Sequence, residues 1–342
     1  MKIAMLSPVT WRTPPRNYGP WEQVTSVLTE ALVKLGVNVT LFATGDSVTQ
    51  AGLRSVVQHP LGEKGGDAKV WEGLHISQVM ESANEFDIIH NHFDFQPLTY
   101  SRLIRTPIIT TIHGFSSEAI VPVYQKYNNN TFYVAISNSD RHPSLEYVDT
   151  VYNGIDEDQF KLGNGQGEYL LYFGRIHPEK GTHRAIDIAR ESGIPLIICG
   201  LVQDDRYFRE QVLPHIDQTT VSFKGNVGPS VRNALMGDAL ALLHPISFQE
   251  PFGLSVAEAM FCGTPVIAFN RGAMKELIVD SKTGYLVEGT REAVEAVKKI
   301  KAINRHDCRE HARRKFSSQA MAAGYMEVYQ KVLNKPGSGF SI

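Results

Sequence analysis

The sequence predicts a protein of two doubly wound α/β domains, each built on a parallel β-sheet with helices on both faces. Three observations predict this class. Short apolar runs alternate with amphipathic stretches, the alternation starts again near residue 169, and 342 residues are enough for two domains. Hydrophobic residues make up 42% of the chain, which is sufficient for an ordinary buried core.

In the first half, residues 2–6 form the first expected strand. A helix is expected over about residues 22–35, because its apolar side chains fall on one face and Gly36 ends it. Further short apolar runs predict strands that are buried on both faces. These runs cover residues 37–43, 86–90, 107–112 and 132–136.

In the second half, the alternation of strands and helices starts again with a strand at residues 169–173. Helices are expected at residues 181–192 and 254–261, between strands. The remaining expected strands cover residues 195–199, 221–223, 239–243 and 265–269.

The two halves join near Asn153-Gly154, where Asn-Gly is a turn signal and a polar, Gly-rich stretch follows. We therefore expect one domain over residues 1–153 and a second over residues 154–318. A last amphipathic segment at about residues 319–333 follows the second sheet, and the tail from Lys335 is expected to be flexible. Ligands of such sheets bind beyond the carboxyl ends of the strands, so function is expected in the loops that follow them.

Composition narrows the class of protein further. The formal net charge of −2 argues against a nucleic-acid partner, because such binding rests on clustered Lys and Arg. The three cysteines, Cys199, Cys262 and Cys308, form no CxxC pair, so neither a disulfide framework nor a zinc site is indicated. Such a scattered set fits a reducing, cytoplasmic setting. The N-terminal apolar run is too short for a signal peptide, and no run approaches the ~18 residues of a membrane span.

The first chemical motif comprises Gly174-Arg175 and Glu179-Lys180-Gly181, directly after a predicted strand. The pattern predicts that Lys180 lies in the first turn of the next helix. Cations at a helix N-terminus oppose its dipole, so two of them there indicate an anion between them, and free N–H groups suit a diphosphate. The alternative is that Arg175 and Lys180 are surface residues of a loop.

The second motif runs from Glu250 to Glu258 and also leads from a strand end into a helix. Gly253 allows the backbone to approach a ligand closely, and the N–H groups of residues 253–255 would face a phosphate. Glu258 lies about one turn further along, where a carboxylate suits the two hydroxyls of a ribose. Glu250 lies at the mouth of the loop, where it could accept hydrogen bonds from sugar hydroxyls. The alternative, a helix with an acidic first turn, explains Glu250 poorly, because it precedes Pro251 outside the helix.

The order GR…EKG, EPFGLSVAEAM, GTPVIA and Glu276 resembles the family 4 glycosyltransferases, which are retaining enzymes of the two-domain GT-B fold. The resemblance covers nearly the whole chain and is strongest over residues 168–290. It implies two facing Rossmann-like domains with an interdomain cleft, and a final helix at about residues 319–334 that crosses back onto the N-terminal, acceptor-side domain. The C-terminal domain would bind the nucleotide sugar.

The resemblance also implies roles for single residues. Arg175 and Lys180 would bind the donor diphosphate, Glu250 would hold the transferred sugar, and Glu258 the ribose. The turn at Gly225-Asn226-Val227 resembles the family's nucleobase-contacting turn. The donor-binding residues expected in all are Gly19, Gly174, Asn226, Val227, Phe252, Gly253, Leu254, Ser255 and Glu258.

The N-terminal half matches the family more loosely. Residues 14–22, PPRNYGPWE, resemble a PPxxYGGxE loop in which Gly19 keeps its amide and Pro20 lacks one. Thr111-Ile-His113-Gly114 resembles the family's TxHG, whose His lies near the donor sugar. His113 therefore joins Arg175, Lys180 and Glu250 as a catalytic candidate, the alternative being a buried structural His.

Two further acidic and histidine-containing patterns predict no metal site. His90-Asn-His92-Phe-Asp94 opens like a metallo-hydrolase signature, but residue 95 is Phe and no later His cluster follows. We interpret this run as part of an acceptor wall, with Asp94 facing the cleft. Asp156-Glu-Asp158 is a formal DxD in the interdomain linker, and we interpret it as a solvated turn.

These features predict a retaining, metal-independent hexosyltransferase of polysaccharide biosynthesis that needs no cofactor. Its donor is expected to be UDP-linked and of glucose type. Its acceptor is expected to be a saccharide, glycolipid or small molecule, and a lipid-linked acceptor would bring weak peripheral membrane contact. The alternatives are a GT-B-type sugar-nucleotide epimerase or phosphorylase, and a catalytically silent sugar-nucleotide-binding subunit. The presence of all four residues Arg175, Lys180, Glu250 and Glu258 counts against the silent subunit, because such a protein need not keep them.

Overall fold

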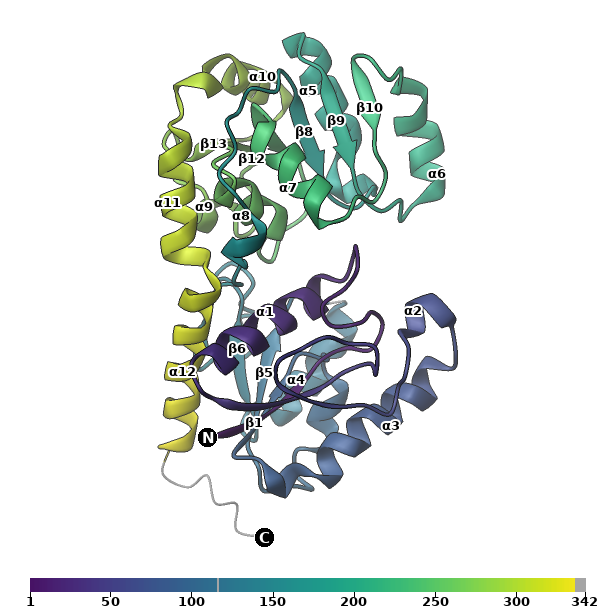
Figure 1. Cartoon of the computed structure of the whole chain (residues 1–342), viewed down its shortest axis with the longest axis vertical. Helices are drawn as coiled ribbons and strands as arrows, with labels where there is room; N and C mark the ends of the chain where they lie inside the picture. Colours follow the sequence, from purple (N-terminus) through teal and green to yellow (C-terminus); the bar gives the residue numbers. More distant parts are fainter. Residues whose placement is uncertain (116, 336–342) are drawn as a thin grey trace. The chain divides into compact units, whose positions relative to one another are not determined.

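The computed structural model describes residues 1–115 and 117–335, and the chain divides into two compact units. The first unit runs from Met1 to Gly154 and resumes at Ser318, and the second runs from Ile155 to Ser317 (Figure 1). The tail that we expected to be flexible lies, apart from Lys335 itself, outside the described residues.

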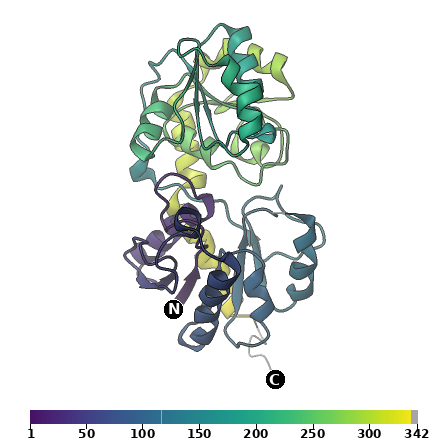
Figure 2. The same cartoon turned by 90° about the vertical axis from the view of Figure 1, so that its right-hand side faces the viewer.

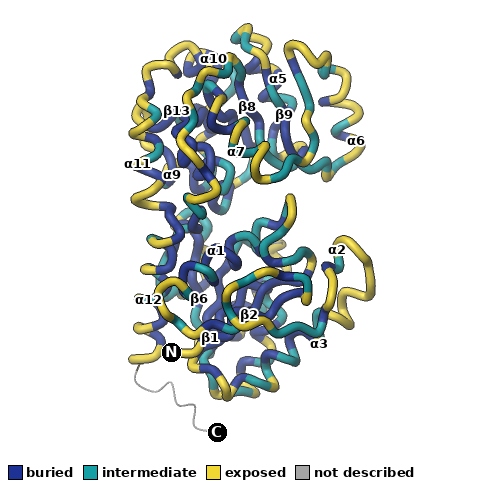
Figure 3. The backbone as a smooth tube through the Cα atoms, viewed as in Figure 1, coloured by how far each residue is buried: buried dark blue, intermediate teal, exposed yellow. Residues whose placement is uncertain are grey.

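The first unit holds a seven-stranded parallel sheet with the strand order β3-β2-β1-β4-β5-β6-β7. The strands are β1 (Lys2–Leu6), β2 (Asn38–Phe42), β3 (Gly52–Arg54), β4 (Ile88–Asn91), β5 (Ile108–Ile112), β6 (Phe132–Ala135) and β7 (Asp149–Thr150). The helices are α1 (Pro20–Lys34), α2 (Leu61–Lys64), α3 (Ala68–Glu81), α4 (Val121–Tyr127) and α12 (Ser318–Leu333). Every residue of β4 and β5 is buried, as expected for central strands of a parallel sheet. Figure 3 shows the interior of each unit as largely dark blue, buried backbone.

The second unit holds a six-stranded parallel sheet with the order β10-β9-β8-β11-β12-β13. Its strands are β8 (Leu170–Phe173), β9 (Leu196–Cys199), β10 (Val221–Phe223), β11 (Ala241–His244), β12 (Val266–Phe269) and β13 (Gly284–Val287). Its helices are α5 (Thr182–Ser192), α6 (Asp205–Tyr207), α7 (Pro229–Asp238), α8 (Leu254–Phe261), α9 (Met274–Leu277), α10 (Thr290–Lys299) and α11 (Arg305–Phe316).

The helices of the second unit form two groups. α5 packs against α10, and α8 packs against α7 and α11. From the middle of the sheet, the connection β8–α5–β9 leads toward one edge and the connection β11–α8–β12 leads toward the other. Connections between parallel strands are right-handed, so the two groups of helices cover opposite faces of the sheet (Figure 2). Parallel strands with helices on both faces confirm the predicted fold class.

Each sheet reverses its strand order at one place, between β1 and β4 in the first unit and between β8 and β11 in the second. The loops that leave neighbouring strands at such a switch point turn to opposite faces and leave a crevice at the carboxyl edge. The residues after β1, β4, β8 and β11 are therefore the ones in place to meet a ligand. Most of the predicted site residues follow these strands.

The last helix, α12, packs on the first unit against α1. Its Tyr329 hydroxyl lies 2.7 Å from Nδ1 of His90 in β4, and its Tyr325 hydroxyl lies 2.6 Å from Oγ1 of Thr111 in β5. Thr111 Oγ1 also lies 2.8 Å from His90 Nε2, so one buried network joins α12 to two central strands. α12 begins at Ser318, one residue before the expected start, and lies within the first unit.

Candidate active site

The turn that carries Lys180 differs from the prediction. Residues Pro178–Lys180 form a 3₁₀ turn, and α5 begins only at Thr182. Gly181 between them has φ +72°, and a Cβ there would collide with the carbonyl oxygen of Pro245. The expectation that Lys180 lies in the first turn of the helix was therefore wrong, because this close approach requires a left-handed residue that separates the turn from the helix.

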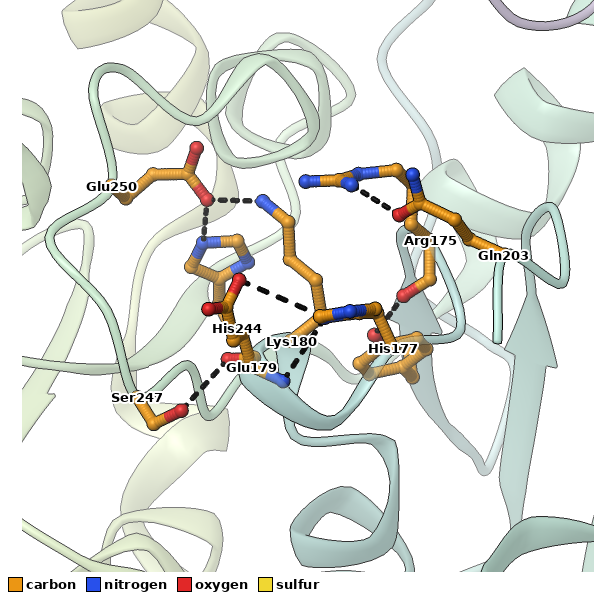
Figure 4. Close-up of polar contacts among 9 residues, drawn as sticks. Arg175, His177, Glu179, Lys180, Gln203, His244, Ser247 and Glu250 are labelled. Carbon is orange, nitrogen blue, oxygen red and sulfur yellow. Dashed lines mark hydrogen bonds and ion pairs between the residues drawn. The ribbon is translucent and has the colours of Figure 1, made fainter. Parts of the chain in front are cut away.

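Lys180 instead forms an ion pair with Glu250, with Nζ 2.6 Å from Oε2 (Figure 4). His244, the last residue of β11, places Nε2 3.3 Å from the same carboxylate oxygen. The side chains of Lys180 and Glu250 are only 14% and 10% exposed, so the pair is largely shielded from water. Burial alone would raise the pKa of Glu250, but Lys180 and His244 more than offset it and lower that pKa to about 2.

The loop after β11 is tied to this turn by further contacts. Ser247 donates to the carbonyl oxygen of Glu179 from its backbone N–H at 2.8 Å and from its hydroxyl at 3.2 Å. The Phe248 ring lies under the ammonium of Lys180, with Nζ 4.5 Å from the ring centroid. The sequence motifs around Lys180 and Glu250 thus form one cluster at the β8/β11 switch point.

Arg175 also follows β8 and, like Lys180, is partly buried; it donates to Oε1 of Gln203 (Figure 4). Its carbonyl oxygen accepts a hydrogen bond from the Tyr172 hydroxyl at 2.9 Å, which holds the loop backbone. Gly174 precedes it and packs against Gly200 at the end of β9. Both predicted residues therefore lie at the carboxyl edge of the sheet.

The start of α8 lies where the sequence predicted it. α8 begins at Leu254 with Gly253 as its N-cap, so the first backbone N–H groups, including that of Ser255, lie at the carboxyl edge. Phe252 is buried. The loop after β12 supports this segment, because Gly272 N–H donates to Gln249 Oε1 at 2.6 Å and Ala273 N–H donates to the Glu250 carbonyl at 2.9 Å.

Glu258 is buried within α8 and has a cation beside it. Arg232 of α7 places Nη1 3.2 Å from Glu258 Oε1, with the two side chains 14% and 6% exposed. Burial raises the pKa of Glu258, and Arg232 opposes that shift. A ribose at Glu258 would therefore meet an arginine as well as a carboxylate. The predicted base-contacting residues Asn226 and Val227 lie in the loop between β10 and α7, and α7 is the helix that carries Arg232.

In the first unit, Gly19 is the N-cap of α1 and Pro20 is its first residue. Burial raises the pKa of Glu22 to about 7, although the Trp11 N–H donates to Glu22 Oε1 at 3.1 Å. His113 follows β5. Its ring stacks on that of Trp21 from α1, with centroids 5.5 Å apart and an interplanar angle of 22°.

The His90–Asp94 run does not gather into a metal site. Across the part of the chain that the structure describes, no three His, Cys, Asp or Glu side chains are placed to hold a metal ion. Asp94 is partly buried and accepts a hydrogen bond from the Tyr124 hydroxyl at 2.5 Å. Asp156 caps its own turn by accepting from the backbone N–H of Asp158 at 3.2 Å, which agrees with its interpretation as a turn residue.

Sequence reasoning missed two residues of the second unit, His244 and Arg232. His244 directly followed a predicted strand, and a polar residue at the carboxyl end of a parallel strand is a usable signal. Arg232 gave no such signal, because it lies on a helix and meets Glu258 only through the packing of α7 on α8.

Comparison with known proteins decides the family. The family described as "Glycosyl transferases group 1" matches residues 154–320, and "Glycosyltransferase Family 4" matches residues 22–159. The chain belongs to glycosyltransferase family 4. It is an enzyme, a glycosyltransferase, and both matched ranges follow the division into two units.

Some relatives of this glycosyltransferase match it along most of its length. An uncharacterized glycosyltransferase of Methanocaldococcus jannaschii is 23% identical over 93% of this chain and 97% of its own. The sucrose-phosphate synthase of Thermosynechococcus elongatus has a TM-score of 0.79 at 18% identity, covering 97% of this chain and 98% of that one. Anabaena HepE, solved with UDP and glucose, has a TM-score of 0.74 at 19% identity, covering 97% and 100%. These likenesses establish that the glycosyltransferase has the GT-B fold.

No helix among the described residues of the glycosyltransferase is long and apolar enough to cross a membrane.

Proposed function

We propose that this glycosyltransferase transfers a hexose, with retention of configuration and without a metal ion, from a nucleoside-diphosphate sugar. The observation that carries the proposal is the cluster of Arg175, Lys180, His244 and Glu250 at the β8/β11 switch point. Two basic side chains and the N-terminus of α8 lie at this edge of the sheet, which suits a diphosphate.

The cations would act on the leaving group. As the bond between the sugar and the diphosphate breaks, negative charge grows on the diphosphate oxygens, and Lys180 and Arg175 would stabilise it. This role replaces that of a metal ion in other phosphate chemistry. Retention would follow if the acceptor attacks from the face that the leaving phosphate occupies, so no protein nucleophile is assigned.

Glu250 would hold the transferred sugar rather than attack it. Because its pKa is lowered to about 2, its carboxylate stays ionised throughout the physiological range and can only accept hydrogen bonds. Hydroxyl groups of a sugar supply donors for those oxygens. Glu258 and Arg232 would contact the ribose, and Asn226 with Val227 the base.

UDP and a glucose-type sugar are the donor that we propose. The support is the fold shared with Anabaena HepE, whose crystal structure was solved in complex with UDP and glucose. His113 and Gly19 of the first unit are the further donor contacts that the family resemblance implies. The acceptor would be a saccharide, a glycolipid or a small molecule, and we propose a cytoplasmic enzyme of polysaccharide biosynthesis without a cofactor.

The proposal is tested by incubating the purified full-length chain with radiolabelled UDP-glucose, UDP-galactose, UDP-N-acetylglucosamine and GDP-mannose against an array of acceptors. We expect transfer from a UDP-hexose, unchanged by EDTA, and an α-linked product from the α-linked donor. Complete loss of activity in EDTA with recovery in Mg²⁺ or Mn²⁺ would contradict the role given to Arg175 and Lys180. Conversion of the donor sugar without any acceptor would indicate an epimerase, and binding of UDP-hexose without turnover would indicate a silent subunit.

A further inference from the structure

The His90–Asp94 run, which the proposed function leaves unused, gives each of its ionisable side chains a different partner. His90 contacts Tyr329 and Thr111 through its two ring nitrogens, and Asp94 accepts from Tyr124. His92 alone in this run meets a predicted catalytic residue, with its Nδ1 2.9 Å from Nε2 of His113.

This contact determines which nitrogen of His113 can reach a substrate. Its Nε2 is occupied by His92, and the stacked Trp21 ring fixes the plane of the imidazole. The nitrogen left for a ligand is Nδ1. Burial lowers the pKa of His113 to about 3, so the ring is neutral at physiological pH and carries one proton. Whether Nδ1 is a donor or an acceptor therefore depends on the partner of Nε2.

The surroundings of His92 Nε2 decide whether the proton shared between His92 and His113 belongs to His92 or to His113. His92 is fully buried, and its Nε2 has no hydrogen-bond partner among the described residues. The neighbouring His90 ring packs against it, with centroids 4.2 Å apart. If His92 carried its proton on Nε2, a buried N–H would be left without an acceptor, and such orphaned donors are rarer in proteins than incompletely used acceptors. The proton therefore belongs on Nδ1, where it is donated to His113.

We propose that His92 is a positioning residue that donates its Nδ1–H to His113 Nε2 and so fixes His113 as the Nδ1–H tautomer. His113 then presents a hydrogen-bond donor, not an acceptor, to an oxygen of the donor sugar. The assignment of a sugar oxygen as the acceptor rests on the proposed function, whereas the tautomer rests on the contacts of the first unit alone.

The tautomer can be measured directly. Full-length protein labelled with ¹⁵N-histidine gives long-range ¹H–¹⁵N correlations that separate protonated from unprotonated ring nitrogens, with assignments from His92→Asn and His113→Asn. We expect a protonated Nδ1 and an unprotonated Nε2 for both His92 and His113. A protonated Nε2 on His113 overturns the proposal, whether or not the protein transfers sugar.

Kinetics test the consequence for the reaction. An Asn amide reaches the place of an imidazole Nδ1, and a Gln amide reaches that of Nε2. We therefore expect His113→Asn to keep more activity than His113→Gln. We expect His92→Leu to lower kcat by about 10–100-fold, by analogy with the loss of a group that orients a metal-bound histidine, with little change in donor KM. His92→Asn, which can still donate to His113, should recover part of that loss.

His75 provides the matched control. It is a fully buried histidine in α3 whose Nε2 lies 2.9 Å from the Ser7 carbonyl oxygen. His75→Leu also removes a buried imidazole, so it should reproduce any loss of stability but leave kcat unchanged. Equal kcat losses in His75→Leu and His92→Leu would overturn the positioning role. Absence of transfer by the unaltered chain, together with the expected tautomers, would refute the proposed function and leave this inference standing.

Discussion

Lys180 and Glu250 neutralise each other's charge, so replacing either residue should also change the stability of the fold. Lys180→Met keeps an unbranched side chain of nearly the same length but removes the charge, which leaves the largely buried Glu250 carboxylate with His244 beside it. Breaking such a pair from one side is costly, so we expect the free energy of unfolding to fall by about 3 kcal/mol. We expect kcat to fall by about 10²–10³-fold, because a group that neutralises the leaving diphosphate is lost.

Lys298 is the matched control, because its Nζ also lies 2.6 Å from a carboxylate oxygen, that of Glu295, but both side chains are more than half exposed. Lys298→Met should change the unfolding free energy by less than about 0.5 kcal/mol. Urea denaturation and steady-state kinetics measure both quantities. A Lys180→Met protein as stable as the unaltered one would show that the ion pair is not formed in solution.

Glu22 should give the protein a distinct dependence of stability on pH. Burial raises the pKa of Glu22 from 4.5 to about 7, so the folded state holds this proton more tightly than the unfolded state. The contribution of this proton to the free energy of unfolding is complete below pH 4.5 and is lost as the pH rises to about 7 and beyond. The shift corresponds to about 3 kcal/mol. Glu22→Gln should flatten this part of the stability curve, measured by urea denaturation at pH 5.0 and 7.5. Equal slopes in the two proteins would contradict the shift.

At the scale of elements, the sequence predicted the strands that lie inside the sheets and missed three of the four edge strands. The missed strands are β3, β7 and β13, at three of the four sheet edges. Interior strands are buried on both faces and read as continuous apolar runs. β3 and β7 are short and have no buried residue, and β13 is half-buried in its middle, so their residues carry no such pattern.

The predicted site residues could be located because they follow strands that the sequence predicts. Ligands bind beyond the carboxyl ends of parallel strands, and the catalytic candidates Arg175, Lys180, Glu250 and His113 all follow interior strands. The pairs Lys180–Glu250, Glu258–Arg232 and His92–His113 join residues far apart in the chain. No local pattern encodes which side chains meet across a loop, so these partners were not predictable.

The short turn before α5 should be sensitive to a single methyl group. Gly181→Ala places a Cβ against the Pro245 carbonyl in addition to forcing a left-handed conformation. Gly193, the C-cap of α5, has nearly the same φ, and a Cβ there meets nothing within 4 Å. We expect Gly193→Ala to cost about 1–2 kcal/mol of stability and Gly181→Ala distinctly more.

Calorimetry of the two glycine variants and of the unaltered chain measures this difference. Gly181→Ala should also lower kcat, because the collision moves the turn that carries Lys180, whereas Gly193→Ala should not. Equal losses of stability in both variants would show that the loop after β11, which carries Pro245, moves to accommodate the added Cβ at little cost in free energy.

At the scale of the whole molecule, α12 completes the first unit from the far end of the chain. Its buried face includes Tyr325, Val328 and Tyr329, and without it His90 and Thr111 lose partners in the interior. A chain ending at Ser317 should therefore lose the folded first unit and keep the second. Limited proteolysis should degrade residues 1–154 and leave a resistant fragment near residues 155–317. Resistance of both units would show that α12 is dispensable.

The chain enters and leaves the second unit at neighbouring points, because Ile155 pairs with Ser317 and its N–H donates to the Phe316 carbonyl at 2.8 Å. The second unit is thus an insertion within the first, and this sets an order of events during synthesis on the ribosome. At roughly 5–20 residues per second, the nascent chain needs roughly 10–35 seconds between Gly154 and the end of α12. The second unit can fold within that interval, while the first waits with the face beside α1, β4 and β5 uncovered. The half of the protein that is made first is therefore the half that is finished last.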